Sequence, residues 1–137
     1  MRCMIPARSK GRILICDDEG GIRDILARLV RHEGYEALEA ADGTAALAAI
    51  RQESPDALLL DIRMPGMDGI EVLRRVRELA PRLPIVMITA CATPPEATAA
   101  LRYGADGYLL KPFQHEDVIR SLQQIMSGRQ VYHSTVD

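Results

Sequence analysis

The stretch ILICDDEGG, residues 13–21, joins four apolar residues to three consecutive acids and a pair of glycines. An uninterrupted apolar run of this kind is typical of a strand buried on both faces, as in a parallel sheet. Adjacent carboxyl groups repel one another and raise one another's pKa, so the fold must supply a compensating charge nearby. The stretch therefore predicts a buried strand that carries a cluster of negative charge at its carboxyl end.

The rest of the chain alternates strand-like and helix-like segments. Strands are expected at 12–16, 35–39, 56–61 (DALLLD), 83–89 (LPIVMIT) and 107–110 (GYLL). Helices are expected at 21–32, from a cap at Asp42 through 50, at 69–79, from a capping box at Thr93–Glu96, and over the apolar stripe from Val118 to Met126. Such alternation favours an α/β fold, a doubly wound, five-stranded parallel sheet with five helices, in which 35–39 is an edge strand and the third and fourth strands are central.

Composition narrows the function classes. A chain of 137 residues corresponds to one domain, and a net charge of −2 offers no basic surface for nucleic acid or a membrane. Residues 1–12 lack the apolar segment of a secretory signal, and three cysteines without ligand spacing suit a reducing compartment. We expect a cytoplasmic protein with an N-terminal extension at 1–11, a domain at 12–128 and a short C-terminal tail at 129–137.

Polar side chains follow four of the five predicted strands. These residues are Asp17, Asp18 and Glu19 after the first strand, Asp61 after the third, Thr89 at the end of the fourth and Lys111 after the fifth. Because the carboxyl ends of parallel strands share one edge, these side chains should converge there. Several carboxylates suit Mg²⁺, and a lysine can bind a carboxylate or a phosphoryl oxygen. A carboxylate can also act as a nucleophile and form an aspartyl phosphate, so this edge predicts phosphoryl chemistry.

Four ordered motifs, ILICDDE, LLLDIRMPGMDG, IVMITA and GYLLKPF, resemble the receiver domain of two-component response regulators. The resemblance covers about 12–127, nearly the whole chain, and implies a flavodoxin-like strand order of 2-1-3-4-5. It also implies a signalling phosphoacceptor, not a conventional turnover enzyme. Its partner would be a sensor histidine kinase or a histidine phosphotransfer protein, with phosphoryl transfer dependent on Mg²⁺.

The resemblance assigns roles to individual residues. Asp61 would be the phosphoacceptor; Asp17, Asp18, Asp61 and the backbone carbonyl of Arg63 would hold the metal; Thr89 and Lys111 would bind the phosphoryl group; Tyr108 would turn inward; and Arg63 and Cys91 would tune the lifetime of the aspartyl phosphate. The Lys111–Pro112 peptide bond would be cis. Movement of Thr89 and Tyr108 would remodel the face formed by the fourth helix, fifth strand and fifth helix.

Plainer readings exist for several of these residues. Thr89 could be an ordinary strand-end residue and Tyr108 ordinary packing, while Glu19 fits a first-turn helix charge better than a metal ligand. Cys16 fits a small buried apolar residue. The fourth helix offers only Ala97, Ala100 and Leu101 as apolar anchors, as a movable element requires.

Two other functions compete with the main one. A phosphohydrolase of the haloacid-dehalogenase type uses a similar set of groups, but its D-x-D-G-T motif on the first strand is not matched by DDEGG at 17–21. A pseudo-receiver that no longer uses phosphate is the other alternative, and the intact acidic and phosphoryl-binding positions argue against it. No segment resembles a DNA-binding helix-turn-helix, so direct nucleic-acid binding is not expected, and a homodimer formed on phosphorylation is a further candidate assembly. The sequence does not identify the kinase or the output target.

Overall fold

The computed structural model describes residues 9–90, 93–127 and 131–132, and these form an α/β fold around one parallel sheet. The strands are β1 (Arg12–Cys16), β2 (Glu36–Ala40), β3 (Ala57–Leu60), β4 (Ile85–Thr89), β5 (Gly107–Leu110) and β6 (Val131–Tyr132). The helices are α1 (Gly20–His32), α2 (Gly43–Glu53), α3 (Gly69–Leu79), α4 (Pro94–Arg102) and α5 (His115–Met126). The strand order is β2-β1-β3-β4-β5-β6.

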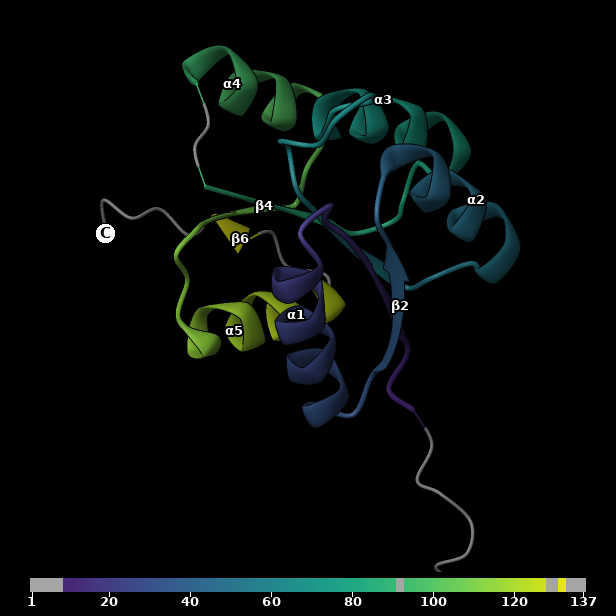
Figure 1. Ribbon diagram of the computed structural model, residues 1–137, viewed down its shortest axis with the longest axis vertical. Helices are drawn as coiled ribbons and strands as arrows, with labels where there is room; N and C mark the ends of the chain where they lie inside the picture. The colour runs from purple at the N-terminus through teal and green to yellow at the C-terminus, as the bar shows by residue number, and fades with distance from the viewer. Residues whose placement is uncertain (1–8, 91–92, 128–130, 133–137) are drawn as a thin grey trace, which may run out of the picture.

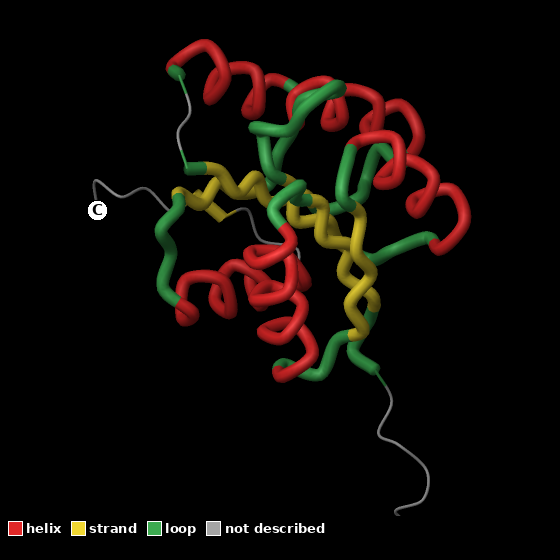
Figure 2. The backbone as a smooth tube through the Cα atoms, viewed as in Figure 1, coloured by secondary structure: helices red, strands yellow, loops and turns green. Residues whose placement is uncertain are grey.

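Helices cover both faces of the sheet. Helices α1 and α5 lie on one face and α2, α3 and α4 on the other (Figure 1), so that the strands run between two helical layers (Figure 2). Along β1 the side chains alternate between these layers: Leu14 and Cys16 belong to the apolar cluster under α2 and α3, while Ile13 and Ile15 belong to the cluster under α1 and α5. Burial on both faces explains why β1, β3 and β4 are almost wholly apolar.

The predicted fold class is confirmed, including the order 2-1-3-4-5 of the first five strands, the edge position of β2 and the central positions of β3 and β4. The structure adds β6, which pairs in parallel with β5 through Gly107↔Val131 and Tyr108↔Tyr132. This strand lies in the segment that the sequence was expected to use as a tail. Two residues are too few to show an alternating pattern, so periodicity could not indicate this strand.

Side-chain caps begin three of the helices, and the sequence predicted those of α2 and α4. Asp42 accepts the N–H of Ala45 at 2.8 Å and begins α2, and the Asp68 carboxylate accepts the N–H of Glu71 at 3.0 Å and begins α3. Helix α4 begins with the predicted capping box of Thr93 and Glu96, followed by Pro94 at its first position.

Helix α4 is weakly anchored, as expected, but through fewer residues than the sequence indicated. Its one buried residue is Ala100, whereas Leu101 is 55% exposed, so the prediction that Leu101 anchors the helix is wrong. Its neighbour Ala100 already occupies the inward position, and a residue one step further along a helix points about 100° away. Over the described residues, no helix is long and apolar enough to cross a bilayer.

Candidate functional site

The candidate site lies at the carboxyl edge of the sheet, where β1, β3, β4 and β5 end. Asp17 directly follows β1 and is 1% exposed, and Asp61 directly follows β3 and is 3% exposed. Thr89 is the last residue of β4 and is fully buried, and Lys111 directly follows β5. Four strands thus deliver two buried carboxylates, a hydroxyl and an ammonium group to one edge, as the sequence predicted.

Lys111 supplies the positive charge that the acidic cluster requires. Its Nζ donates hydrogen bonds to Asp17 Oδ2 at 2.8 Å and to Asp61 Oδ2 at 3.2 Å, with Glu19 Oε1 at 3.4 Å. The Lys111 side chain is only 10% exposed, so solvent screens these interactions weakly. The peptide bond between Lys111 and Pro112 is cis, as the resemblance implied.

The burial of these charges perturbs their titration. The pKa of Asp61 is raised, first by burial and then by the negative charge of Asp17, and the charge of Lys111 opposes this only in part. Burial works to lower the pKa of Lys111, but the hydrogen bond and charge of Asp17, with the charge of Asp61, outweigh it and the pKa is raised. The ammonium therefore stays charged while Asp61 retains unfavourable energy in its ionised form.

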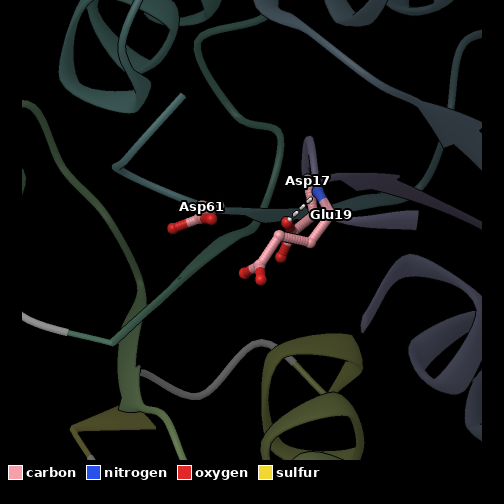
Figure 3. A group of neighbouring side chains, drawn as sticks. All are labelled: Asp17, Glu19 and Asp61. Atoms are coloured by element: carbon pink, nitrogen blue, oxygen red, sulfur yellow. Dashed lines mark hydrogen bonds between the residues drawn. The ribbon is translucent and has the colours of Figure 1, made fainter. Parts of the chain in front are cut away.

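Three carboxylates could hold a cation. Oxygens of Asp17, Glu19 and Asp61 all lie within 4.8 Å of one another (Figure 3). Carboxylate oxygens are the donors that a hard divalent cation such as Mg²⁺ prefers, so the residues present fit the expected metal.

The acidic run contributes to this group in a way that sequence reasoning missed. Asp18 is exposed and lies outside the group, whereas Glu19, which we expected to be a helix charge, belongs to it. The N–H of Glu19 donates to Asp17 Oδ1 at 2.9 Å, so the chain is still turning into α1 at this point. The three acids are adjacent in the sequence, so the way the chain turns into α1 decides which carboxylates meet. Direct metal binding by Asp18 stays a prediction.

Arg63 connects Asp61 to another element. Its backbone N–H donates to Asp61 Oδ1 at 3.2 Å, and its guanidinium forms an ion pair with Glu96 Oε1 at 2.9 Å. The expected role of its carbonyl as a metal ligand stays a prediction. Cys91, the other expected tuning residue, lies outside the described residues.

Tyr108 lies on β5, beside the strand that ends at Thr89. It is half-buried and packs against the apolar cluster beneath α2 and α3. In the sheet register Tyr108 pairs with Met87 of β4, two residues before Thr89. The two expected switch residues therefore lie on adjacent strands at the same edge, and their movement stays a prediction.

Close backbone packing holds the loop that carries Asp61. Gly69, the first residue of α3, donates its N–H to the carbonyl of Ile62 at 2.8 Å. A Cβ at this glycine would lie 2.6 Å from Ile62 Cα and would also overlap the carbonyl oxygen of Asp61. A residue without a side chain is therefore required where α3 meets the candidate phosphoacceptor.

Cys16 has the expected structural role. It is 1% exposed, and burial raises the pKa of its thiol to about 12, with the charge of Asp17 as the next cause. A thiol with such a pKa is neutral and unreactive near neutral pH.

Known proteins resemble this chain over most of its length. The family model described as the response regulator receiver domain matches residues 13–123. The chain is 35% identical over 125 residues to the probable transcriptional regulatory protein TcrX of Mycobacterium tuberculosis, covering 91% of this chain and 53% of that protein. It is 41% identical over 115 residues to the response regulator MprA of Mycobacterium avium, covering 84% and 50%. The chain thus spans about half the length of these relatives.

A solved structure shares the whole fold. The crystal structure of a CheY-like response regulator receiver domain protein from Methanospirillum hungatei superimposes with a TM-score of 0.83 at 33% sequence identity. The match covers 85% of this chain and 94% of that one. The likeness therefore extends over a complete domain of the same architecture.

Proposed function

The chain belongs to the response regulator receiver domain family, and we propose that Asp61 accepts a phosphoryl group from a phosphohistidine. The donor would be a sensor histidine kinase or a histidine phosphotransfer protein. The observation that carries the proposal is the Asp61 carboxylate, which is 3% exposed at the carboxyl edge of the sheet and is bound, together with that of Asp17, by Lys111. The strand order and the family match leave the phosphohydrolase alternative without support.

In the proposed reaction an Asp61 carboxylate oxygen attacks phosphorus and the P–N bond of the phosphohistidine breaks. The imidazole nitrogen leaves with the bonding electron pair, and an acyl phosphate remains on Asp61. Lys111, which holds the Asp61 carboxylate at 3.2 Å before the reaction, would bind a phosphoryl oxygen afterwards. The hydroxyl of Thr89 would bind another.

The acidic residues would hold Mg²⁺. We assign Asp17 and Asp61 to this role, together with Asp18 and the carbonyl of Arg63, and we add Glu19 because its carboxylate belongs to the same group. When bound, the ion would offset the negative charge of the carboxylates and of the transferring phosphoryl group. The same acidic site would support later hydrolysis of the acyl phosphate, so the protein would be a signalling phosphoacceptor with limited chemistry of its own.

The proposed output is a change in the face formed by α4, β5 and α5. Thr89 would move to the phosphoryl group and Tyr108 would turn inward behind it. Helix α4, which buries only Ala100, would respond at low energetic cost. Arg63 and Cys91 would set the lifetime of the phosphorylated state.

The partners beyond the kinase are also proposals. The match covers only about half of each relative, so an output domain or a separate target protein would receive the signal. We propose that residues 12–128 act as the signalling unit and that this unit does not itself bind nucleic acid. We also propose that it acts in the cytoplasm and forms a homodimer when it is phosphorylated.

The proposal is tested with Mg²⁺ and a small phosphodonor, acetyl phosphate or phosphoramidate. Intact mass should show one added phosphoryl group in the wild type only when Mg²⁺ is present, and none in Asp61→Asn. A phosphate ester such as p-nitrophenyl phosphate serves as the control substrate, because a phosphohydrolase would turn it over and a receiver would not.

Rapid hydrolysis could hide the adduct, so binding of beryllofluoride, a phosphoryl mimic, is measured in parallel. Binding that requires both Mg²⁺ and Asp61 would support the proposal. The absence of both an adduct and beryllofluoride binding would contradict the proposal and would favour a pseudo-receiver.

A further inference from the structure

We propose that Arg63 binds the phosphoryl group once Asp61 is phosphorylated, and that in the unmodified protein Glu96 holds its guanidinium away from this role. The exchange of Glu96 for the phosphoryl group would loosen the start of α4. This inference rests on the proposed phosphorylation of Asp61 and concerns what happens next to it.

The first observation is that Arg63 contacts two elements at once. Its backbone N–H donates to Asp61 Oδ1 at 3.2 Å, which fixes the main chain of Arg63 beside the candidate phosphoacceptor. Its side chain runs to α4, where Nη2 lies 2.9 Å from Glu96 Oε1. A long cationic side chain that begins beside Asp61 is therefore bound to a neighbouring helix.

The second observation is that Glu96 also builds the cap of that helix. Glu96 Oε1 accepts the N–H of Thr93 at 3.0 Å, and the Thr93 hydroxyl accepts the N–H of Glu96 at 3.3 Å. Arg63 therefore binds the same carboxylate oxygen that closes the capping box. Because α4 buries only Ala100, loss of this ion pair should loosen its first turn.

The chemistry favours exchange. A phosphoryl group carries about −1.5 to −2 charge and three acceptor oxygens. The planar guanidinium of arginine matches such a group through two parallel hydrogen bonds. Glu96 offers a single charge, and the Arg63 side chain is 52% exposed, so solvent weakens the existing pair. The phosphoryl group is thus the stronger ligand.

The side chain also has room to move. A hollow of about 310 Å³ lies between the loop after β3 and the start of α4, and it is lined by Ile62, Arg63, Met64, Pro65, Asp68 and Glu96. The Arg63–Glu96 pair therefore borders open space.

The first test measures, by fluorine NMR, the affinity of the protein for beryllofluoride in the presence of Mg²⁺. Glu96→Gln keeps the capping acceptor, since glutamine serves at this position of a capping box, but it removes the charge that holds Arg63. We expect it to tighten binding about two- to fivefold. Glu116→Gln removes an exposed charge from the first turn of α5 and should leave affinity within about 1.5-fold.

Arg63→Gln should weaken binding about tenfold, because a hydrogen bond to a charged group is lost. In the Arg63→Gln background, Glu96→Gln should have no further effect, since the cation that it releases is gone. An effect of Glu96→Gln that persists in that background, or one no larger than that of Glu116→Gln, would overturn the inference while leaving the proposed function intact.

The second test needs no phosphoryl mimic. Amide hydrogen exchange in the first turns of α4, measured in metal-free protein, should be about two- to fivefold faster in Glu96→Gln and in Arg63→Gln than in the wild type. In the double variant it should be no faster than in either single variant. Unchanged exchange in both single variants would overturn the inference. Failure of the wild type both to form the phosphoryl adduct and to bind beryllofluoride would overturn the proposed function and this inference with it.

Discussion

Replacing Lys111 by methionine should destabilise the metal-free protein by about 3 kcal/mol at pH 7.5. The Nζ that is lost lies 2.8 Å from Asp17 and 3.2 Å from Asp61, and the side chains of the two acids are only 2% and 4% exposed. Breaking a buried ion pair typically costs 3–5 kcal/mol, since it leaves a charge without compensation. We place the cost at about the lower end of that range, because Asp61 already has a raised pKa and can take up a proton.

The sign of the pH dependence follows from the same carboxylate. Lys111 lowers the pKa of Asp61 in the wild type, so its removal raises that pKa further above the unfolded value of about 3.9. The folded state then binds more protons than the unfolded state, and the free energy of unfolding falls as pH rises through this window. The deficit of the variant should therefore be largest near pH 7.5 and should shrink towards pH 4.

Urea unfolding at pH 7.5 and pH 4.5, with a chelator and then with Mg²⁺, measures both effects. Lys10→Met is the matched control, because Lys10 is the other lysine of the chain and is exposed, and it should change stability by about 0.5 kcal/mol or less. Added Mg²⁺ should stabilise Lys111→Met more than the wild type, because it replaces the missing positive charge. A wild-type unfolding free energy, or a deficit that does not depend on pH, would refute this reasoning.

Three other variants test separate parts of the structure. Asp61→Asn removes a carboxylate whose pKa is raised, so the free energy of unfolding of the metal-free protein should rise by about 1 kcal/mol at pH 7.5. This gain should shrink as pH falls towards 4, and a gain that stays constant in thermal unfolding across that range would contradict the reasoning. Gly69→Ala should cost about 2 kcal/mol or more in urea unfolding, because its Cβ meets backbone, whereas Gly21→Ala, with open space around its Cβ, should cost nothing. Arg77→Met should lower the free energy of unfolding by about 3 kcal/mol, because the Arg77 side chain is 18% exposed and binds a carboxylate and several backbone carbonyls. Arg102 is exposed, so Arg102→Met should change it by about 0.5 kcal/mol or less. Equal effects of the two variants would contradict a stabilising role for the buried Arg77.

Much of the fold could be predicted because its signals are local and periodic. Continuous apolar runs distinguished the central β3 and β4 from the edge strand β2, and the caps at Asp42 and Thr93 marked helix starts. Strand β6 could not be predicted, because two residues hold no period and its place depends on the free edge of β5. Leu101 was assigned to the core by residue type, but the direction of a side chain on a short helix depends on how the helix packs.

The candidate site divides in the same way. The position of Asp17, Asp61, Thr89 and Lys111 follows from one rule, that the carboxyl ends of parallel strands share an edge. The choice between Asp18 and Glu19 depends on how the chain turns into α1, and composition carries no such information. The Arg63–Glu96 pair joins residues 33 positions apart in the sequence, so only the folded structure reveals it.

The most direct test of the central claim is the identity of the phosphorylated residue. After reaction with Mg²⁺ and acetyl phosphate, borohydride reduces an acyl phosphate to the corresponding alcohol, so a phosphorylated aspartate becomes homoserine while free carboxylates stay unchanged. Peptide mapping by mass spectrometry should then find homoserine at position 61 alone, and none without Mg²⁺. Homoserine at position 17 or 18, or a stable phosphoryl adduct that borohydride does not convert, would contradict the assignment of Asp61 as the phosphoacceptor.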